Sequence, residues 1–173
     1  MFYISYGSNM NIEQMAWRCP NTEIYGIGKL YGWKLVFNYH ADIIKTGKKS
    51  DTVPVVVWKL DDKNDLANLD RYEGYPSYYV KKRINVIMEN GEKLKAMVYT
   101  MANDRKGIFP PSQTYLDCIR EGYEANNIDI TPLYEAVHES ICIDNITKYN
   151  QYNPRKSKMN NPYTYDWDYV DWM

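Results

Sequence analysis

The 173-residue sequence predicts an α+β fold, that is, one mixed domain of strands and helices. Two observations support this prediction. Between residues 23 and 101, apolar side chains recur mainly at every second position, which is the period of strands that turn one face to a core. Several other segments begin with a capping side chain or a proline of the kind that starts helices. With 45% hydrophobic residues, the chain can bury a substantial single core.

The chain starts with a short apolar strand, residues 1–4, and continues into the loop Tyr6-Gly7-Ser8-Asn9. Asn11 then suits the N-cap of a helix, with Gln14 reaching back as in a capping box, and Pro20 ends that helix. Free backbone N–H groups near the loop can bind a carboxylate or another anion, because glycine lets the ligand approach closely. Alternatively, these residues only form a tight turn.

Four segments in the middle of the chain have the alternation of strands: residues 23–37, 53–60, 79–88 and 92–101. The last two flank Asn90-Gly91, the dipeptide most favoured in a two-residue hairpin turn. One face of this predicted hairpin is apolar, so we expect that face to meet the core.

Three more helices are indicated by the residues that would start them. Asp61-Asp62 opens a helix that ends at Gly74. Ser112 follows two prolines and can cap a second helix, and Thr131-Pro132 opens a third.

We divide the chain into a domain over residues 1–144 and a tail over residues 145–173. The tail contains a polar stretch, 150–162, that has no apolar period and is typical of a linker or a mobile segment. Aromatic residues then alternate with aspartates: Tyr163, Tyr165, Trp167, Tyr169 and Trp172. Such side chains are not expected to stay in water. They dock on the domain, contact a partner or another subunit, or cover a pocket.

Composition excludes several classes of function. The formal net charge is −1, so nothing favours binding to nucleic acid or to a membrane surface. No signal peptide or membrane-spanning apolar run occurs, so we expect a cytoplasmic protein. Three widely spaced cysteines form neither a disulfide framework nor a zinc pattern, and no metal or nucleotide motif is present. We therefore expect neither a metal nor a cofactor; the sequence leaves the oligomeric state open.

Glu73 is the strongest candidate for a catalytic residue. It lies between Tyr72 and Tyr75, where a predicted helix breaks at Gly74. A carboxylate in water is a poor base at neutral pH, so a catalytic one must be partly desolvated, and the neighbouring tyrosines could provide an apolar wall. The alternative interpretation is a surface glutamate at the end of a helix.

Together, the Tyr6-Gly7-Ser8-Asn9 loop and the segment Leu69-Asp70-x-x-Glu73-Gly74 resemble the gamma-glutamylcyclotransferase superfamily. Over residues 2–140, further landmarks agree in order: residues 30–37, 57–60, Val98-Tyr99 and 110–115. The glutathione-specific branch tends to have an apolar residue where Asn9 stands. This chain is therefore more similar to the general gamma-glutamyl-amine (AIG2-like) branch or its bacterial peptide-deprotecting relatives. The resemblance implies a small, mixed, mostly antiparallel β-barrel with flanking helices.

The resemblance also implies an enzyme that needs no cofactor. A gamma-glutamyl group carries an α-amine that can attack its own side-chain carbonyl, closing a five-membered lactam, 5-oxoproline, and releasing an amine. Glu73 would transfer the protons. The glutamyl α-carboxylate and the developing oxyanion would be bound by the loop and the preceding strand, and two later tyrosines match tyrosines that line the family's site. The implied substrate-binding residues are Tyr3, Ile4, Ser5, Tyr6, Gly7, Ser8, Asn9, Tyr79 and Tyr115.

Two hypotheses follow. The first is an active cyclotransferase for a small gamma-glutamyl substrate: glutathione, a gamma-glutamyl amino acid, a gamma-glutamyl-amine, or a gamma-glutamylated antibiotic or peptide. The second is a non-catalytic binding module of the same fold that uses the pocket or the aromatic tail. An acidic residue at position 73 favours the first, because binding alone does not require it.

Overall fold

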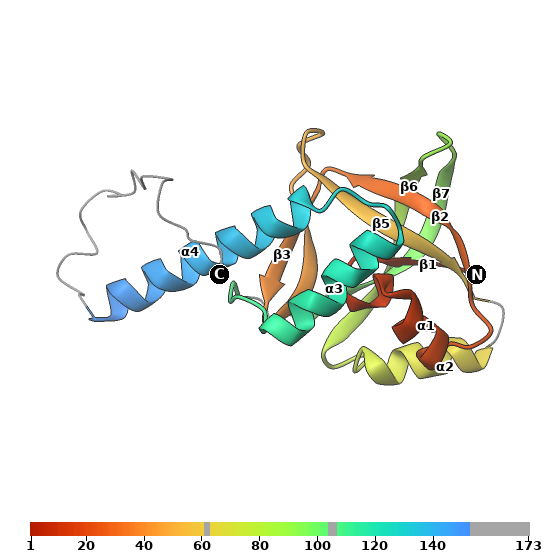
Figure 1. Ribbon diagram of the computed structural model, residues 1–173, viewed down its shortest axis with the longest axis horizontal. Coiled ribbons are helices and arrows are strands. Elements are labelled where there is room, and N and C mark those ends of the chain that lie inside the picture. Colours follow the sequence, from red (N-terminus) through yellow and green to blue (C-terminus); the bar gives the residue numbers. More distant parts are fainter. Residues whose placement is uncertain (61–62, 104–106, 153–173) are drawn as a thin grey trace.

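In the computed structural model, residues 1–60, 63–103 and 107–152 are described. Five strands close a barrel in the order β1-β5-β2-β6-β7 (Figure 1). Their bounds are Phe2–Ser5 for β1, Thr52–Lys59 for β5, Glu23–Tyr31 for β2, Tyr79–Met88 for β6 and Lys93–Met101 for β7. Neighbouring strands are antiparallel except β1 and β7, which pair in parallel and close the barrel. The predicted α+β fold with a mostly antiparallel barrel is confirmed.

A separate two-stranded sheet consists of β3 (Trp33–Asn38) and β4 (His40–Lys45). The sequence suggested one strand over residues 23–37, but Gly32, with a φ of +77°, turns the chain and divides this stretch into two strands. A tight turn at Tyr39, whose φ is +59°, then leads into β4. His40 therefore begins a strand.

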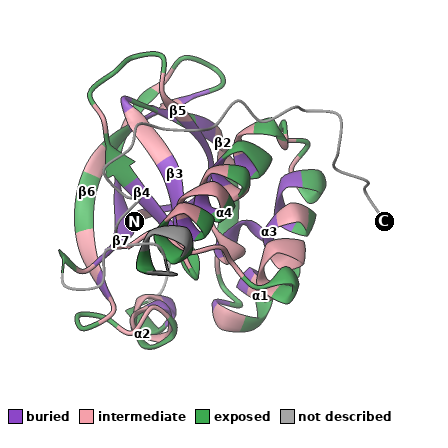
Figure 2. Ribbon diagram, turned by 90° about the vertical axis from the view of Figure 1, so that its left-hand side faces the viewer, coloured by how far each residue is buried: buried purple, intermediate pink, exposed green. Residues whose placement is uncertain are grey.

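The core fills the barrel interior and the space beneath the helices (Figure 2). Strand β5 is buried from Val53 to Trp58 because most of its residues are β-branched, which suits a strand covered on both faces. The hairpin of β6 and β7 forms as predicted, but its turn is longer. Gly91 donates to the Met88 carbonyl at 2.9 Å and has a φ of +85°, giving a three-residue loop rather than a two-residue turn.

The helices are α1 (Ile12–Arg18), α2 (Lys63–Tyr72), α3 (Gln113–Ala125) and α4 (Thr131–Tyr152), with a 3₁₀ turn, η1 (Ser8–Met10), before α1. The predicted N-cap of α1 is confirmed: Asn11 Oδ1 accepts from the backbone N–H of Gln14 at 3.1 Å. The return bond of a capping box is absent. The N–H of Asn11 donates to the Ser8 carbonyl, and the Gln14 side chain donates to Cys118 Sγ.

Helix α3 lies against η1, and the contact requires a glycine. A Cβ added to Gly122 would come within 2.7 Å of the Asn11 nitrogen and the Met10 carbonyl carbon. Two side-chain amides fasten the same contact: Asn126 donates to the Met10 carbonyl at 3.0 Å, and Asn11 donates to Glu121 Oε2 at 3.0 Å. Ser112 caps α3 as predicted, accepting from the N–H of Tyr115. The contacts of Glu121, Gly122 and Asn126 fix the second half of α3 against the end of η1.

Helix α4 packs its first half on β3 and continues to residue 152 (Figure 1). It therefore crosses residue 144, where the sequence suggested that the domain ends. The aromatic part of the predicted tail, Tyr163 to Trp172, lies outside the described residues, and the division of the chain stays a prediction. Among the helices described, none has the length and apolar character to cross a membrane.

Candidate active site

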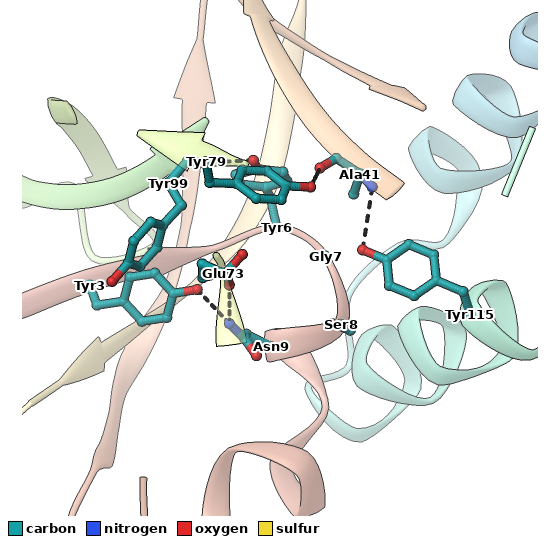
Figure 3. A pocket seen from close by; sticks show the side chains of 10 residues that line it. All are labelled: Tyr3, Tyr6, Gly7, Ser8, Asn9, Ala41, Glu73, Tyr79, Tyr99 and Tyr115. Atoms are coloured by element: carbon teal, nitrogen blue, oxygen red, sulfur yellow. Dashed lines mark hydrogen bonds between the residues drawn. The ribbon is translucent and has the colours of Figure 1, made fainter. Parts of the chain in front are cut away.

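One pocket collects most of the residues that the sequence singled out (Figure 3). It occupies about 300 Å³, including the part open to solvent, at the end of β1 where the barrel meets α2, α3 and β4. The lining residues are Tyr3, Tyr6, Gly7, Ser8, Asn9, Ala41, Glu73, Tyr79, Tyr99 and Tyr115. Eight of the ten predicted site residues are among them. Ile4 and Ser5 are not, and Ala41 and Tyr99 were not predicted.

Glu73 follows directly on the last turn of α2. Its N–H still donates to the Leu69 carbonyl at 2.9 Å, and Gly74, with a φ of +61°, then turns the chain away. The Glu73 carboxyl points into the pocket (Figure 3), where Oε1 accepts from Asn9 Nδ2 at 2.7 Å. Burial raises the Glu73 pKa to about 7, although the charge of Arg18 and hydrogen bonds from Asn9 and Tyr3 act in the opposite direction. Near neutral pH this group can both accept and donate a proton.

Asn9 links the carboxyl to the barrel. Its buried side-chain amide donates to the Tyr3 hydroxyl at 2.8 Å as well as to Glu73. The indole nitrogen of Trp58 donates to the Asn9 carbonyl at 3.1 Å and to Ser5 Oγ at 2.9 Å. Ser5 therefore supports the loop from within the core. Ile4 is fully buried there too, so contact between the backbone of these two residues and a substrate stays a prediction.

The loop that leads from β1 into η1 presents the predicted backbone donors. The N–H groups of Met10 and Asn11 are already bonded to the carbonyls of Gly7 and Ser8. The N–H groups of residues 7–9 take no part in these two bonds and lie at the 3₁₀ turn rather than at α1; that of Ser8 also interacts with the Tyr115 hydroxyl. A Cβ on Gly7 would lie 3.1 Å from Ala41 Cβ and 3.2 Å from the Tyr115 hydroxyl. With a φ of −122°, Gly7 is needed for close packing and not for a special backbone angle.

Tyr79 and Tyr115, which match tyrosines that line the family's site, differ in the hydrogen bonds of their hydroxyl groups. Tyr79 donates to the Ala41 carbonyl at 2.6 Å, so its hydrogen is committed. Tyr115 accepts from the Ala41 N–H at 3.3 Å, and its own hydrogen remains available to donate into the pocket (Figure 3). Burial raises the pKa of both, that of Tyr115 to about 12, so both are neutral at pH 7.

Ala41 and Tyr99 line the pocket but were not predicted, and the sequence indicates only one of them. Ala41 contributes mainly backbone atoms, and an alanine gives no chemical hint of such a role. Tyr99 belongs to a landmark of the resemblance, Val98-Tyr99, and could have been found from it. Its carbonyl accepts from the Tyr6 hydroxyl at 2.7 Å. His40 lies next to the pocket without lining it: its Nδ1 is 2.9 Å from the Tyr78 hydroxyl, and its ring meets that of Tyr115 edge-on.

Within residues 1–60, 63–103 and 107–152, no group of three or more histidine, cysteine, aspartate or glutamate side chains is placed to hold a metal ion. The pocket is built instead from phenol, amide and carboxyl groups around backbone N–H donors. Such a set suits a small polar ligand that carries both a carboxylate and an amine.

Comparison with known proteins identifies the family. The family model described as "Gamma-glutamyl cyclotransferase, AIG2-like" matches residues 3–117. The gamma-glutamylcyclotransferase of Bos taurus is 30% identical over 139 residues, which cover 74% of this chain and 72% of the relative. The Homo sapiens gamma-glutamylcyclotransferase has the same identity and coverage. The chain belongs to the gamma-glutamyl cyclotransferase, AIG2-like, family, and the predicted resemblance is confirmed.

Solved structures show the same fold. One described as "Gamma-glutamyl cyclotransferase" superposes with a TM-score of 0.65 at 24% identity and covers 95% of this chain and 91% of its own. YkqA from Bacillus subtilis superposes with a TM-score of 0.66 at 20% identity, covering 81% of this chain and 54% of its own.

Proposed function

We propose that the protein converts a small gamma-glutamyl amide into 5-oxoproline and a free amine. One observation carries the proposal: the buried Glu73 carboxyl, with a pKa of about 7, lies in the same pocket as the backbone donors of residues 7–9. A proton-transfer group poised near neutral pH and a site for anionic oxygen are the two parts that this cyclisation needs.

In the proposed reaction, Glu73 takes a proton from the α-ammonium of the glutamyl group. The amine nitrogen then forms a bond with the side-chain carbonyl carbon, and negative charge develops on the carbonyl oxygen. The bond from that carbon to the leaving nitrogen breaks as Glu73 returns a proton to the leaving nitrogen. Glu73 then passes the second proton of the attacking nitrogen to the released amine, so that a neutral lactam and an ammonium ion are formed. Because nucleophile and electrophile belong to one molecule, the reaction as written balances without water or a cofactor.

Binding of the substrate would divide between the loop and α3. The N–H groups of residues 7–9 favour the α-carboxylate or the developing oxyanion, because they point donors at an anion without a basic side chain. Tyr115 can donate its hydroxyl hydrogen to the same end of the substrate. Tyr79, whose hydrogen is held by Ala41, would pack against the glutamyl chain.

The environment of Glu73 favours catalysis over binding alone. A module that only held an ammonium group would gain most from a carboxylate that is fully charged at neutral pH. Burial instead raises the pKa of Glu73 to about 7, which weakens such an ion pair and gives a better base. We therefore place the non-catalytic module second.

The test is a substrate panel: glutathione, a gamma-glutamyl amino acid, a gamma-glutamyl-amine and a gamma-glutamylated peptide. Each is incubated with the protein, and 5-oxoproline is measured by mass spectrometry, with boiled protein as the blank. Because the chain has Asn9, we expect most product from the amino acid or amine substrates and least from glutathione. Calorimetric binding of a panel member without any product would favour the binding module.

A further inference from the structure

Arg18, the last residue of α1, lies behind the pocket and not in its lining. Its Nη1 donates to Asn9 Oδ1 and lies 3.5 Å from Ser8 Oγ. The guanidinium lies over the ring of Tyr72, with its central carbon 4.8 Å from the ring centroid. On the other side of α1, the Asn68 side chain donates to the Arg18 carbonyl at 3.1 Å. Arg18 thus connects the loop, α1 and the end of α2.

The direction of the hydrogen bond from Arg18 decides how the amide of Asn9 is turned. A guanidinium has only donors, so the amide must face Arg18 with its oxygen. The two hydrogens of Nδ2 then point the other way, to Tyr3 at 2.8 Å and to Glu73 at 2.7 Å. If the amide were flipped, its oxygen would face the carboxylate of Glu73, and two acceptors would be in contact.

We propose that Arg18 is a positioning residue: its guanidinium fixes the Asn9 amide so that Nδ2 holds the Glu73 carboxylate in place for proton transfer. This inference rests on the proposed function of Glu73 as the acid–base group. It adds to the site a residue that does not line the pocket but contacts two residues that do, Ser8 and Asn9.

Further contacts of Arg18 agree with this role. The Nε of Arg18 is buried without a hydrogen-bond partner among the described residues. The side chain therefore lies where one of its own donors is left unsatisfied, which is unusual for a buried polar group. Among the ionisable groups around Glu73, Tyr3, Tyr79, Tyr99 and Tyr115 have pKa values raised by burial and are neutral at pH 7. The guanidinium of Arg18 is the charge that acts on Glu73, lowering its pKa and so favouring the carboxylate.

The experiment compares four proteins with the parent: Arg18→Met, Arg18→Lys, Asn9→Leu and the double variant Arg18→Met/Asn9→Leu. The Glu73 pKa is followed by carboxyl ¹³C NMR without substrate, and kcat for 5-oxoproline formation is measured across pH. Arg83→Met, which removes an exposed arginine from β6, is the matched control for a lost positive charge.

In Arg18→Met we expect the Glu73 pKa and the acid limb of kcat to rise together by about one unit, since a favourable charge and a fixed donor are lost. At neutral pH kcat should fall about tenfold, in the range of couplings within one hydrogen-bond network. Arg18→Lys keeps a donor-only cation and should recover most of both effects. The double variant should have a kcat no lower than that of Asn9→Leu, and Arg83→Met should match the parent.

Three results would overturn the inference: a Glu73 titration that Arg18→Met leaves unchanged, a folded Arg18→Lys as impaired as Arg18→Met, or fully additive losses in the double variant. If Arg18→Met does not fold, the same titration on Arg18→Gln decides, because glutamine is neutral and can present either an oxygen or a nitrogen to Asn9. The NMR titration needs no turnover. A protein that forms no 5-oxoproline from any substrate would refute the proposed function while the role of Arg18 is still measured.

Discussion

Two carboxyl groups three residues apart at the end of α2 have opposite surroundings. Asp70 accepts from the Tyr99 hydroxyl at 2.6 Å and forms an ion pair with Lys81, whose Nζ is 2.6 Å from Oδ1. Glu73 accepts from an amide and a phenol, and among the residues that the structure describes it forms no ion pair. The ion pair ties Asp70 to β6, whereas burial raises the pKa of Glu73 to about 7. The first suits an anchor and the second a proton-transfer group.

The anchor also sets the place of the second carboxyl. Lys81 and Tyr99 are opposite each other in the ladder between β6 and β7, so Asp70 ties α2 to two strands of the barrel at once. Glu73 then leaves the helix less than one turn later and reaches the pocket. The position of the one group therefore depends on the charge pairing of the other.

The comparison is tested most severely by Glu73→Gln. The amide keeps the volume of the side chain and removes the proton-transfer group, so we expect a loss in kcat of at least ~100-fold. The loss in kcat is measured by quantifying 5-oxoproline formed from the best substrate of the panel. Near-parent activity in a folded variant would mean that Glu73 is not the base.

The same variant should change how stability depends on pH. Because burial raises the Glu73 pKa from 4.5 to about 7, the folded parent loses stability as the pH rises through this interval. Glu73→Gln avoids that loss. We expect it to be more stable than the parent by up to about 3 kcal/mol at pH 8 and nearly equal to it at pH 4.

Urea titrations of both proteins at pH 4, 6 and 8 measure the difference. A gap that does not grow with pH would show that the carboxyl of Glu73 is not desolvated in solution.

Asp70→Asn should do the reverse: it should cost stability and spare most of the chemistry. The pair with Lys81 is partly buried, at 28% and 24% side-chain exposure, so we expect a loss of about 1–2 kcal/mol in unfolding free energy. We expect kcat to fall less than tenfold, because the amide still accepts from Tyr99. Asp117→Asn, which breaks a more exposed pair with Arg120 on α3, is the control and should leave stability nearly unchanged.

Gly7→Val leaves the carboxyl groups of Asp70 and Glu73 in place and blocks the proposed anion site, which shares the pocket with Glu73. The new side chain would press on Ala41 and Tyr115 and cover the backbone donors, so we expect at least a tenfold loss of affinity for a gamma-glutamyl amide. Ser8→Ala should be milder. Calorimetric titration measures both, and unchanged affinity in Gly7→Val would rule out the proposed anion site.

Much of this arrangement was accessible from the sequence because it depends on local signals. Asn11 and Ser112 mark helix starts by their side chains, Gly74 marks the break after α2, and Glu73 lies at that break. Each of these features is decided by residues within one or two turns of the chain.

What was missed depends on contacts between distant segments. The turn at Gly32 that separates β2 from β3 brings Ala41 to the pocket, and only its backbone is used there. Arg18 looks like any charge at the end of a helix until Asn9 is placed beside it. No periodicity or capping rule reports such pairings: Ala41 lies 38 and 74 positions from the two tyrosines that it bonds, and Asn9 and Arg18, though nine positions apart, belong to different elements.

The close fit of Gly122 on η1 has a consequence for the synthesis of the protein. The loop and Glu73 are made early, but Tyr115 lies 74 positions after Ala41, and Glu121 of α3 lies 110 positions after Asn11. A growing chain is elongated from its amino end at about 5–20 residues per second, so α3 is added to the rest of the pocket seconds later. Until α3 leaves the ribosome, the pocket lacks Tyr115, so we expect the proposed activity only in chains long enough to include α3.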